Sequence, residues 1–121
     1  MKTTAAAFAF SLLFAGFGAA LPVQADSLAY GPDTCRNGFV WREAAIHDHV
    51  CVRPSSRSVA AQENAMAFSR IDPAGAYGPF TCINGFVWRE AFPGDAVCVT
   101  PDRRSIVRNE NANARRTRVL G

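Results

Sequence analysis

Residues 81–101 read TCINGFVWREAFPGDAVCVTP, and residues 34–54 read TCRNGFVWREAAIHDHVCVRP. The two stretches are 47 positions apart, and this offset holds without a gap from Tyr30–Ala65 to Tyr77–Ala112. Of these 36 aligned positions, 23 are identical. An internal repeat of this kind indicates that the fold is built from two copies of one small unit.

Each copy predicts a turn, a β-hairpin and a helix, in that order. Asn-Gly pairs at 37–38 and 84–85 mark turns, and the β-branched and aromatic residues after them favour strands. Pro93-Gly94 fits a tight turn in the second hairpin, where the first copy has Ala45-Ile46-His47-Asp48. Helices are expected to begin near Ser55 and Thr100, because Ser or Thr caps a helix and Pro fits its first turn. We expect strands over Phe39–Ala44, Val50–Val52, Phe86–Ala91 and Val97–Val99.

The turn of the second hairpin sets a register for its strands. If Ala91 faces Ala96, then Arg89 faces Cys98 and Trp88 faces Val99. The core face would then carry Phe86, Trp88, Glu90, Val97 and Val99, and the other face Val87, Arg89 and Cys98. We expect the two repeats to bury their tryptophan faces against each other or under the helices.

The predicted fold is α+β, with two tandem disulfide-stapled hairpin-plus-helix repeats that form one small pseudo-twofold domain. A unit this short rarely folds without a cross-link or a partner. Four cysteines allow three pairings. A duplicated unit keeps a bond that it can make within itself, which favours Cys35–Cys51 and Cys82–Cys98. Each bond would close a loop of about 15 residues, worth on the order of 3 kcal/mol.

Residues 1–25 have the pattern of a cleaved signal peptide. Lys2 gives a positive start, an apolar run follows to Leu21, and Val23-Gln24-Ala25 has the small-x-small form of a cleavage site. The alternative is a membrane helix, which needs about 20 apolar residues, and we expect no other membrane span. The domains are then a signal peptide (1–25), a first repeat (26–70), a Pro- and Gly-containing linker (71–76) and a second repeat with a basic tail (77–121). The end of the second helix is expected to fray, with the tail arginines solvated: Arg115, Arg116 and Arg118.

Charge and cysteine content bound the location and the partners. After removal of the signal, 12 arginines would face 10 acidic residues, a net charge of +2. A near-neutral body argues against a nucleic-acid partner, which binds basic surfaces. Paired cysteines in a small exported chain indicate an oxidising compartment. We therefore expect a secreted or periplasmic protein.

Charged residues that recur in both copies are the main candidates for a site. Paired carboxylates can act as general acid and base, but no nucleophile accompanies them, so we expect no enzyme. Arginine–carboxylate forks that fix hairpin to helix explain the recurrence more simply, and ligand binding is the alternative. We expect Glu43 to pair with Arg57 and Glu90 with Arg104. The candidates are Arg42, Glu43, Asp48 and Arg57 in the first copy and Arg89, Glu90, Asp95 and Arg104 in the second, with Glu63-Asn64 and Glu110-Asn111 also recurring.

Aromatic and histidine residues are the other candidates. Trp41 and Trp88 fit a core position, or an exposed platform that stacks on a sugar ring or a peptide. His47 and His49 lie two apart, so on a strand they share a face and could hold a metal ion. The second copy has no histidine at these positions, and two ligands do not complete a site. The sequence therefore predicts no metal and no cofactor.

The second copy follows the pattern GPxTCxNGFVWREA and then DxVCVTPxxR. This pattern resembles a cysteine-bearing repeat of uncharacterised exported proteins from high-GC bacteria, and it covers nearly all of the mature chain, twice. The first copy departs from it at Ala45-Ile46-His47 and at Arg53. The resemblance implies export and small size, and it carries no activity.

The predicted function is a small exported non-enzymatic binding or interaction module of the bacterial cell envelope or exterior. Its partner would be an envelope polymer or a protein. One alternative is a secreted protease inhibitor, which would present the loop Ala45–Asp48 or Phe92–Asp95. A second alternative is a structural protein of the envelope.

Overall fold

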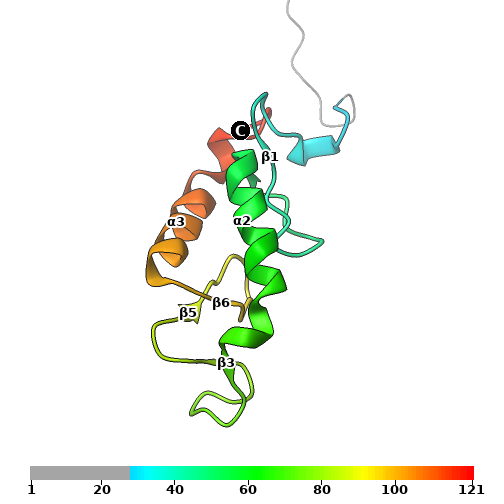
Figure 1. Ribbon diagram of the computed structural model, residues 1–121. Helices are drawn as coiled ribbons and strands as arrows, with labels where there is room; N and C mark the ends of the chain where they lie inside the picture. The colour runs from blue at the N-terminus through cyan, green and yellow to red at the C-terminus, as the bar shows by residue number, and fades with distance from the viewer. Residues whose placement is uncertain (1–27) are drawn as a thin grey trace, which may run out of the picture.

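The computed structural model describes residues 28–121, so the predicted signal peptide and the start of the mature chain near Asp26 lie outside the described residues. The described chain has α+β architecture, as predicted (Figure 1). In that part of the chain, no helix is long and apolar enough to cross a membrane. In chain order the elements are η4 (Gly31–Asp33), β1 (Val40–Trp41), β2 (Cys51–Val52), α2 (Pro54–Ala65), η5 (Ala67–Arg70), β3 (Ile71–Asp72), β4 (Thr81–Cys82), β5 (Val87–Trp88), β6 (Cys98–Val99), α3 (Pro101–Ala112) and η6 (Ala114–Arg116).

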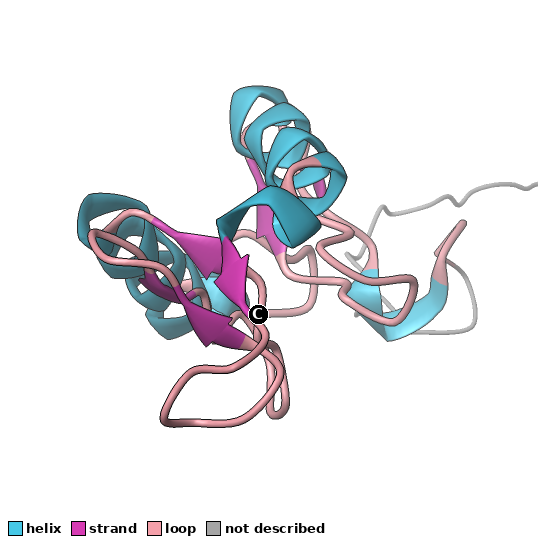
Figure 2. Cartoon of the chain, turned by 60° about the horizontal axis from the view of Figure 1, so that its bottom comes forward, coloured by secondary structure: helices cyan, strands magenta, loops and turns pink. Residues whose placement is uncertain are grey.

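Both hairpins are antiparallel, and each of their strands has two residues. Figure 2 shows the strands as short arrows beside the helices. Trp88 faces Cys98 and Val87 faces Val99, so the predicted register is wrong by one residue. A shift of one residue moves every side chain to the opposite face. Arg89, which was expected to face away from the core, is therefore buried, and Trp88 is not.

The strands end early because the chain turns at Glu43 and Glu90. Both residues have left-handed backbone angles, with φ of 53° and 56°, which a continuing strand does not permit. The loop that follows is organised by a single aspartate in each repeat. Asp95 accepts hydrogen bonds from the backbone N–H of Ala91 (2.9 Å) and of Val97 (3.3 Å). These donors bind a side chain instead of a facing strand, so the ladder does not extend to Ala91.

The two helices begin at prolines and have equal lengths. The Oγ1 of Thr100 accepts from the N–H of Arg103 (3.2 Å), which confirms the predicted cap of α3. The first helix begins one residue before the predicted Ser55, and its capping residue, Arg53, makes no side-chain cap. The helix α3 ends at Ala112, and after Asn113 the chain continues as η6.

The segments that follow the two helices close the fold. Strand β3 pairs with β4, so that Ile71 faces Cys82. At the equivalent place in the other repeat, Arg118 faces Cys35 in an isolated bridge, and the N–H of Arg36 donates to the O of Thr117 (2.8 Å). The C-terminus consequently lies near β1 (Figure 1). The segment 71–76 is therefore not merely a linker, and Arg118 of the basic tail is held against the first repeat, while Arg115 and Arg116 are exposed, as predicted.

Both predicted disulfides are present. Cys35–Cys51 and Cys82–Cys98 each join residues 16 positions apart, with Cα–Cα distances of 5.5 and 5.6 Å. No cysteine among the described residues is free. Two disulfides in so small a chain are compatible with an oxidising location.

The apolar core is small, and it contains charge. Its buried cluster consists of alanines and one valine: Ala44, Ala60, Ala91 and Val107, with Phe92 packed against it. The largest fully buried side chains of the described chain are Arg42 and Arg89. Both tryptophans are only half-buried, so the prediction of a tryptophan-faced core is wrong. Each indole N–H instead donates to a backbone oxygen of its own repeat, that of Asp33 for Trp41 and that of Phe80 for Trp88 (both 2.8 Å).

Candidate functional site

A buried arginine lies beside a buried aspartate in each repeat. Arg42 donates from Nε to Asp48 Oδ2 (2.7 Å) and from Nη2 to Oδ1 (3.1 Å), a two-pronged contact. Arg89 and Asp95 repeat it at 2.8 and 3.2 Å. Such forks are the strongest arginine–carboxylate geometry. Here each fork fixes the arginine to the loop that its aspartate organises.

The remaining donors of each arginine cross to the other repeat. Arg42 Nη1 donates to Glu110 Oε1 (3.2 Å), and its Nη2 donates to Asn111 Oδ1 (2.9 Å) and to the O of Ala91 (3.2 Å). Arg89 makes the same set of contacts in the opposite direction, to Glu63 Oε1 (3.3 Å), Asn64 Oδ1 (3.0 Å) and the O of Ala44 (3.5 Å). This reciprocal exchange relates the two repeats as a pseudo-twofold pair.

Arg103 breaks the symmetry between α2 and α3, which lie side by side (Figure 1). Its counterpart in the first repeat is Ser56. Arg103 donates from Nε to Glu63 Oε2 (2.9 Å) and from Nη1 to Ser56 Oγ (3.1 Å), while the hydroxyl of Ser56 bonds to Glu110. One extra cation thus joins the two helix carboxylates, since Arg103 Nη1 also lies 3.9 Å from Glu110 Oε2.

The buried network leaves little room for chemistry. Arg42 and Arg89 are fully buried, and Asp48 and Asp95 nearly so. Every one of these side chains binds protein groups, and a buried charge needs such partners to be tolerated. The network holds the two repeats together, which agrees with the structural interpretation of the recurring charges for these four residues.

The two predicted glutamate–arginine pairs, Glu43–Arg57 and Glu90–Arg104, are also present, and they lie at the surface. Arg57 Nη2 lies 2.6 Å from Glu43 Oε1, and Arg104 Nη2 lies 3.0 Å from Glu90 Oε1. All four side chains are between 32% and 50% exposed, so the expectation that the glutamates point into the core is wrong. The cause is again the turn at Glu43 and Glu90, which directs these side chains outward.

An aromatic groove of about 310 Å³ lies on the surface of the first repeat beside this pair. The rings of Tyr30 and Trp41 meet edge to face, with centroids 5.5 Å apart. Tyr30 is 68% exposed, although its N–H is anchored to Thr34 Oγ1 (3.1 Å). The groove is lined by Tyr30, Thr34, Cys35, Phe39, Val40, Trp41 and Arg57.

The second repeat carries the same seven residue types at the equivalent positions: Tyr77, Thr81, Cys82, Phe86, Val87, Trp88 and Arg104. The Tyr77 and Trp88 rings also meet edge to face, at 6.4 Å, and Tyr77 is 78% exposed. The cavity on this side has a volume of about 250 Å³ and is lined by Val87, Pro101, Arg104, Ser105 and Arg108. The aromatic residues of the groove therefore recur in the second repeat, but they do not line this cavity.

The two histidines lie together at the edge of a second cavity in the first repeat. The ring of His49 stacks on Trp41 with centroids 3.8 Å apart, and the ring of His47 meets Phe92 edge to face at 4.6 Å. Within residues 28–121, no group of three or more His, Cys, Asp or Glu side chains is placed to hold a metal ion. The pair thus has no third protein ligand in this part of the chain.

Recurrence between the copies found some of these residues and missed others. It pointed to the buried arginines, to their aspartates and to the surface pairs. It did not point to Arg103, Asp33 or Arg118, because the other copy has a different residue at each position. The exposed tyrosines did recur, and that signal was available in the sequence.

Comparison with family models, with curated proteins and with solved structures finds no match for this chain.

Proposed function

We propose that this chain is an exported, non-enzymatic binding module that recognises a sugar polymer of the bacterial cell envelope through the exposed tyrosine and the tryptophan of each repeat. The signal-peptide pattern of residues 1–25 and the two disulfides support a periplasmic or secreted location. The observation that carries the proposal is the repeated exposed tyrosine. Tyr30 and Tyr77 add little to the core, yet both copies keep them edge to face against the equivalent tryptophan.

The groove has the chemistry that a sugar ring requires. An aromatic face offers an apolar surface to the C–H groups of a ring, and the hydroxyls need polar partners around it. Arg57 has five N–H donors, and it contacts Glu43 Oε1 through its Nη2. Arg104 and Glu90 provide the same arrangement in the second repeat. Two sites with the same residue types on one domain suit a polymer, since the second contact is made at a high effective concentration.

The test is binding of the folded protein to purified peptidoglycan and to short oligosaccharides cut from it. Tyr30→Ala and Tyr77→Ala should each weaken binding to the polymer, and the double variant should abolish it. Phe68→Ala is the matched control, because Phe68 is aromatic, 82% exposed and does not line the aromatic groove. Single variants should lose more affinity for the polymer than for the oligosaccharide. Polymer binding by the double variant at the wild-type level would contradict the proposal.

One observation favours a second candidate, a protease inhibitor. Ile46 is 93% exposed at the tip of the loop 44–48, and Asp48 fixes both sides of that loop by accepting from the N–H groups of Ala44 (3.1 Å) and Val50 (3.4 Å). A rigid loop with one projecting side chain suits insertion into a protease cleft, because the loop loses little conformational entropy on binding. A panel of proteases tests this: inhibition that Ile46→Asp removes, without loss of polymer binding, would favour the inhibitor.

A further inference from the structure

Two equivalent grooves lie next to the hairpin loops, one in each repeat. The groove of the first repeat has a volume of about 320 Å³, and that of the second about 360 Å³. Phe92 lines both of them. Their other shared positions carry the same residue types: Asp48 and Asp95, Val50 and Val97, Ala91 and Ala44, Ala114 and Ala67.

The linings differ at five equivalent positions: Phe92 of the first corresponds to Ala45 of the second, and the other four differences change the charge. The groove of the first repeat is lined at these four places by Asp33, His47, His49 and Arg118. The groove of the second repeat has Phe80, Gly94, Ala96 and Ile71 at the equivalent places. We call the first the ionisable groove and the second the apolar groove. The second repeat keeps the same fold without any of the four ionisable residues. The fold therefore does not require them, and a ligand is the better reason for their gathering.

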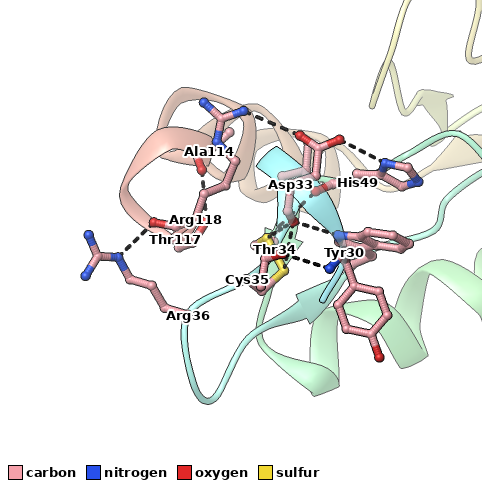
Figure 3. The surroundings of a disulfide bond; sticks show 12 residues. Tyr30, Asp33, Thr34, Cys35, Arg36, His49, Ala114, Thr117 and Arg118 are labelled. Carbon is pink, nitrogen blue, oxygen red and sulfur yellow. Dashed lines mark hydrogen bonds and ion pairs between the residues drawn. A yellow bond between two sulfur atoms is a disulfide. The ribbon is translucent and has the colours of Figure 1, made fainter. Parts of the chain in front are cut away.

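Three of the four side chains contact one another at the mouth of the ionisable groove. Asp33 Oδ2 lies 3.1 Å from His49 Nδ1, and its Oδ1 lies 3.6 Å from Arg118 Nη1 (Figure 3). They come from η4, from the returning side of the hairpin and from the C-terminal tail. Each side chain is about a third exposed, so the cluster is both ordered and reachable from solvent. The Nε of Arg118 is buried and has no hydrogen-bond partner among the described residues.

The charges of the groove set the sign of its ligand. Asp33 is offset by Arg118, and Asp48, at the floor, is offset by the buried Arg42 that it binds at 2.7 Å. The remaining groups from the packed α3 and η6, Asn111 and Ala114, are uncharged. The groove is thus near neutral while its histidines are unprotonated. Protonation of both rings would give the groove two positive charges.

We propose that the ionisable groove binds a small anionic group, a carboxylate or a phosphate-type oxyanion, and that it binds this group when His47 and His49 are protonated. The Nδ1 of His49 faces Asp33, so its Nε2 is the nitrogen free to donate to a ligand. Phe92, Pro93 and Val50 give the groove apolar walls for the part of the ligand next to the anion. The ionisable groove has no lining residue in common with the aromatic groove, and this proposal does not rest on the proposed function.

The test is a titration of the full-length mature protein, followed through the ring signals of the two histidines by NMR. Sulfate serves as the oxyanion probe, since it keeps its charge across the range, and acetate serves as the carboxylate probe. At least one probe should perturb both rings saturably at about pH 5.5, at least roughly tenfold more tightly than at about pH 7.5. The probe that binds more tightly identifies the anion.

The second repeat supplies the matched variant. A chain with Asp33→Phe, His47→Gly, His49→Ala and Arg118→Ile carries at these four positions the residues that the fold already accepts in the apolar groove. Because this variant has no histidine, its binding is measured by isothermal titration calorimetry: it should stay folded and bind neither probe. His47→Gly alone is the second variant, because His47 is exposed and its loss leaves the Asp33 contacts intact. It should weaken binding at about pH 5.5. No saturable binding of either probe at either pH, or unchanged binding by His47→Gly, would overturn the proposal.

Discussion

Arg42 and Glu110 are 68 positions apart in the chain, yet they form a 3.2 Å ion pair between the hairpin of one repeat and the helix of the other. Arg89 and Glu63 form the reciprocal pair at 3.3 Å. Because each hairpin is completed by the helix of the other repeat, neither repeat has all of its partners within its own sequence. The stability of this chain should therefore depend on the buried arginines more than on its small apolar core.

Substitution of Arg42 by methionine should cost about 3–5 kcal/mol, because it leaves the Asp48 carboxylate buried without its partner. Arg57→Met is the matched control. It removes the same kind of side chain from a half-exposed pair with Glu43, and such pairs are worth about 0–1 kcal/mol. Urea unfolding of the two variants measures both changes. Equal losses would show that the burial of Arg42 does not matter.

Unfolding should occur in one transition, although the chain consists of two repeats. Trp41→Phe and Trp88→Phe each leave one tryptophan as the reporter of a single repeat, and each removes one equivalent indole N–H bond. In each variant, the fluorescence curve should superimpose on the curve from far-UV circular dichroism, which follows both helices, as it does for a two-state protein. Two separate midpoints would mean that the exchanged arginine contacts do not couple the repeats.

Glu90 is the place to test the backbone of the turn. A residue other than glycine in the left-handed region costs roughly 1–2 kcal/mol. Glu90→Gly should relieve this cost while it removes the exposed contact with Arg104, so stability should change little. Glu90→Val loses the same contact and adds a β-branched side chain at φ 56°. The glycine variant should thus be more stable than the valine variant by at least about 1 kcal/mol in urea unfolding, and the reverse order would contradict the role of the turn.

The repeat, the fold class and both disulfides could be read from the sequence, because a duplicated unit shows its own boundaries. The position of the turn could not. The left-handed angle at Glu90 is unusual for glutamate and is held there by the Asp95 bonds to Ala91 and Val97, which sequence pattern does not reveal. This one residue shifts the register, and the shift exchanges Trp88 and Arg89 between surface and core.

The candidate site was harder to read for a related reason. Comparison of the two copies finds the residues that the copies share. It therefore pointed to Trp41 and Trp88 and missed the ionisable groove, where the copies differ. Asp33 and Arg118 come from the two ends of the described chain and meet only because the tail returns to the first repeat. A closure of this kind is a property of the whole fold, and no local pattern indicates it.

A circular permutant tests that closure directly. The N–H of Val119 donates to the O of Thr34 (2.9 Å), at the place where Asp72 pairs with Thr81 in the other repeat. Four residues, 73–76, connect Asp72 to Tyr77, and a direct fusion of Gly121 to Leu28 would likewise place four residues between Val119 and Tyr30. The chain would be opened between Ala74 and Gly75, in the exposed original junction.

This permutant should fold, form both disulfides and unfold within about 1 kcal/mol of the unpermuted residues 28–121, because one loop is opened and an equal one is closed. The control has the same fusion but is opened between Ile46 and His47. That cut separates Ala44 from Asp48, which binds its N–H at 3.1 Å and also holds Arg42. The control should be less stable than the first permutant by several times about 1 kcal/mol, since the cut frees the loop that positions a buried charge. If the first permutant is unfolded, or if both permutants are equally stable, the two junctions are not equivalent and the fold does not close as a pair of matched repeats.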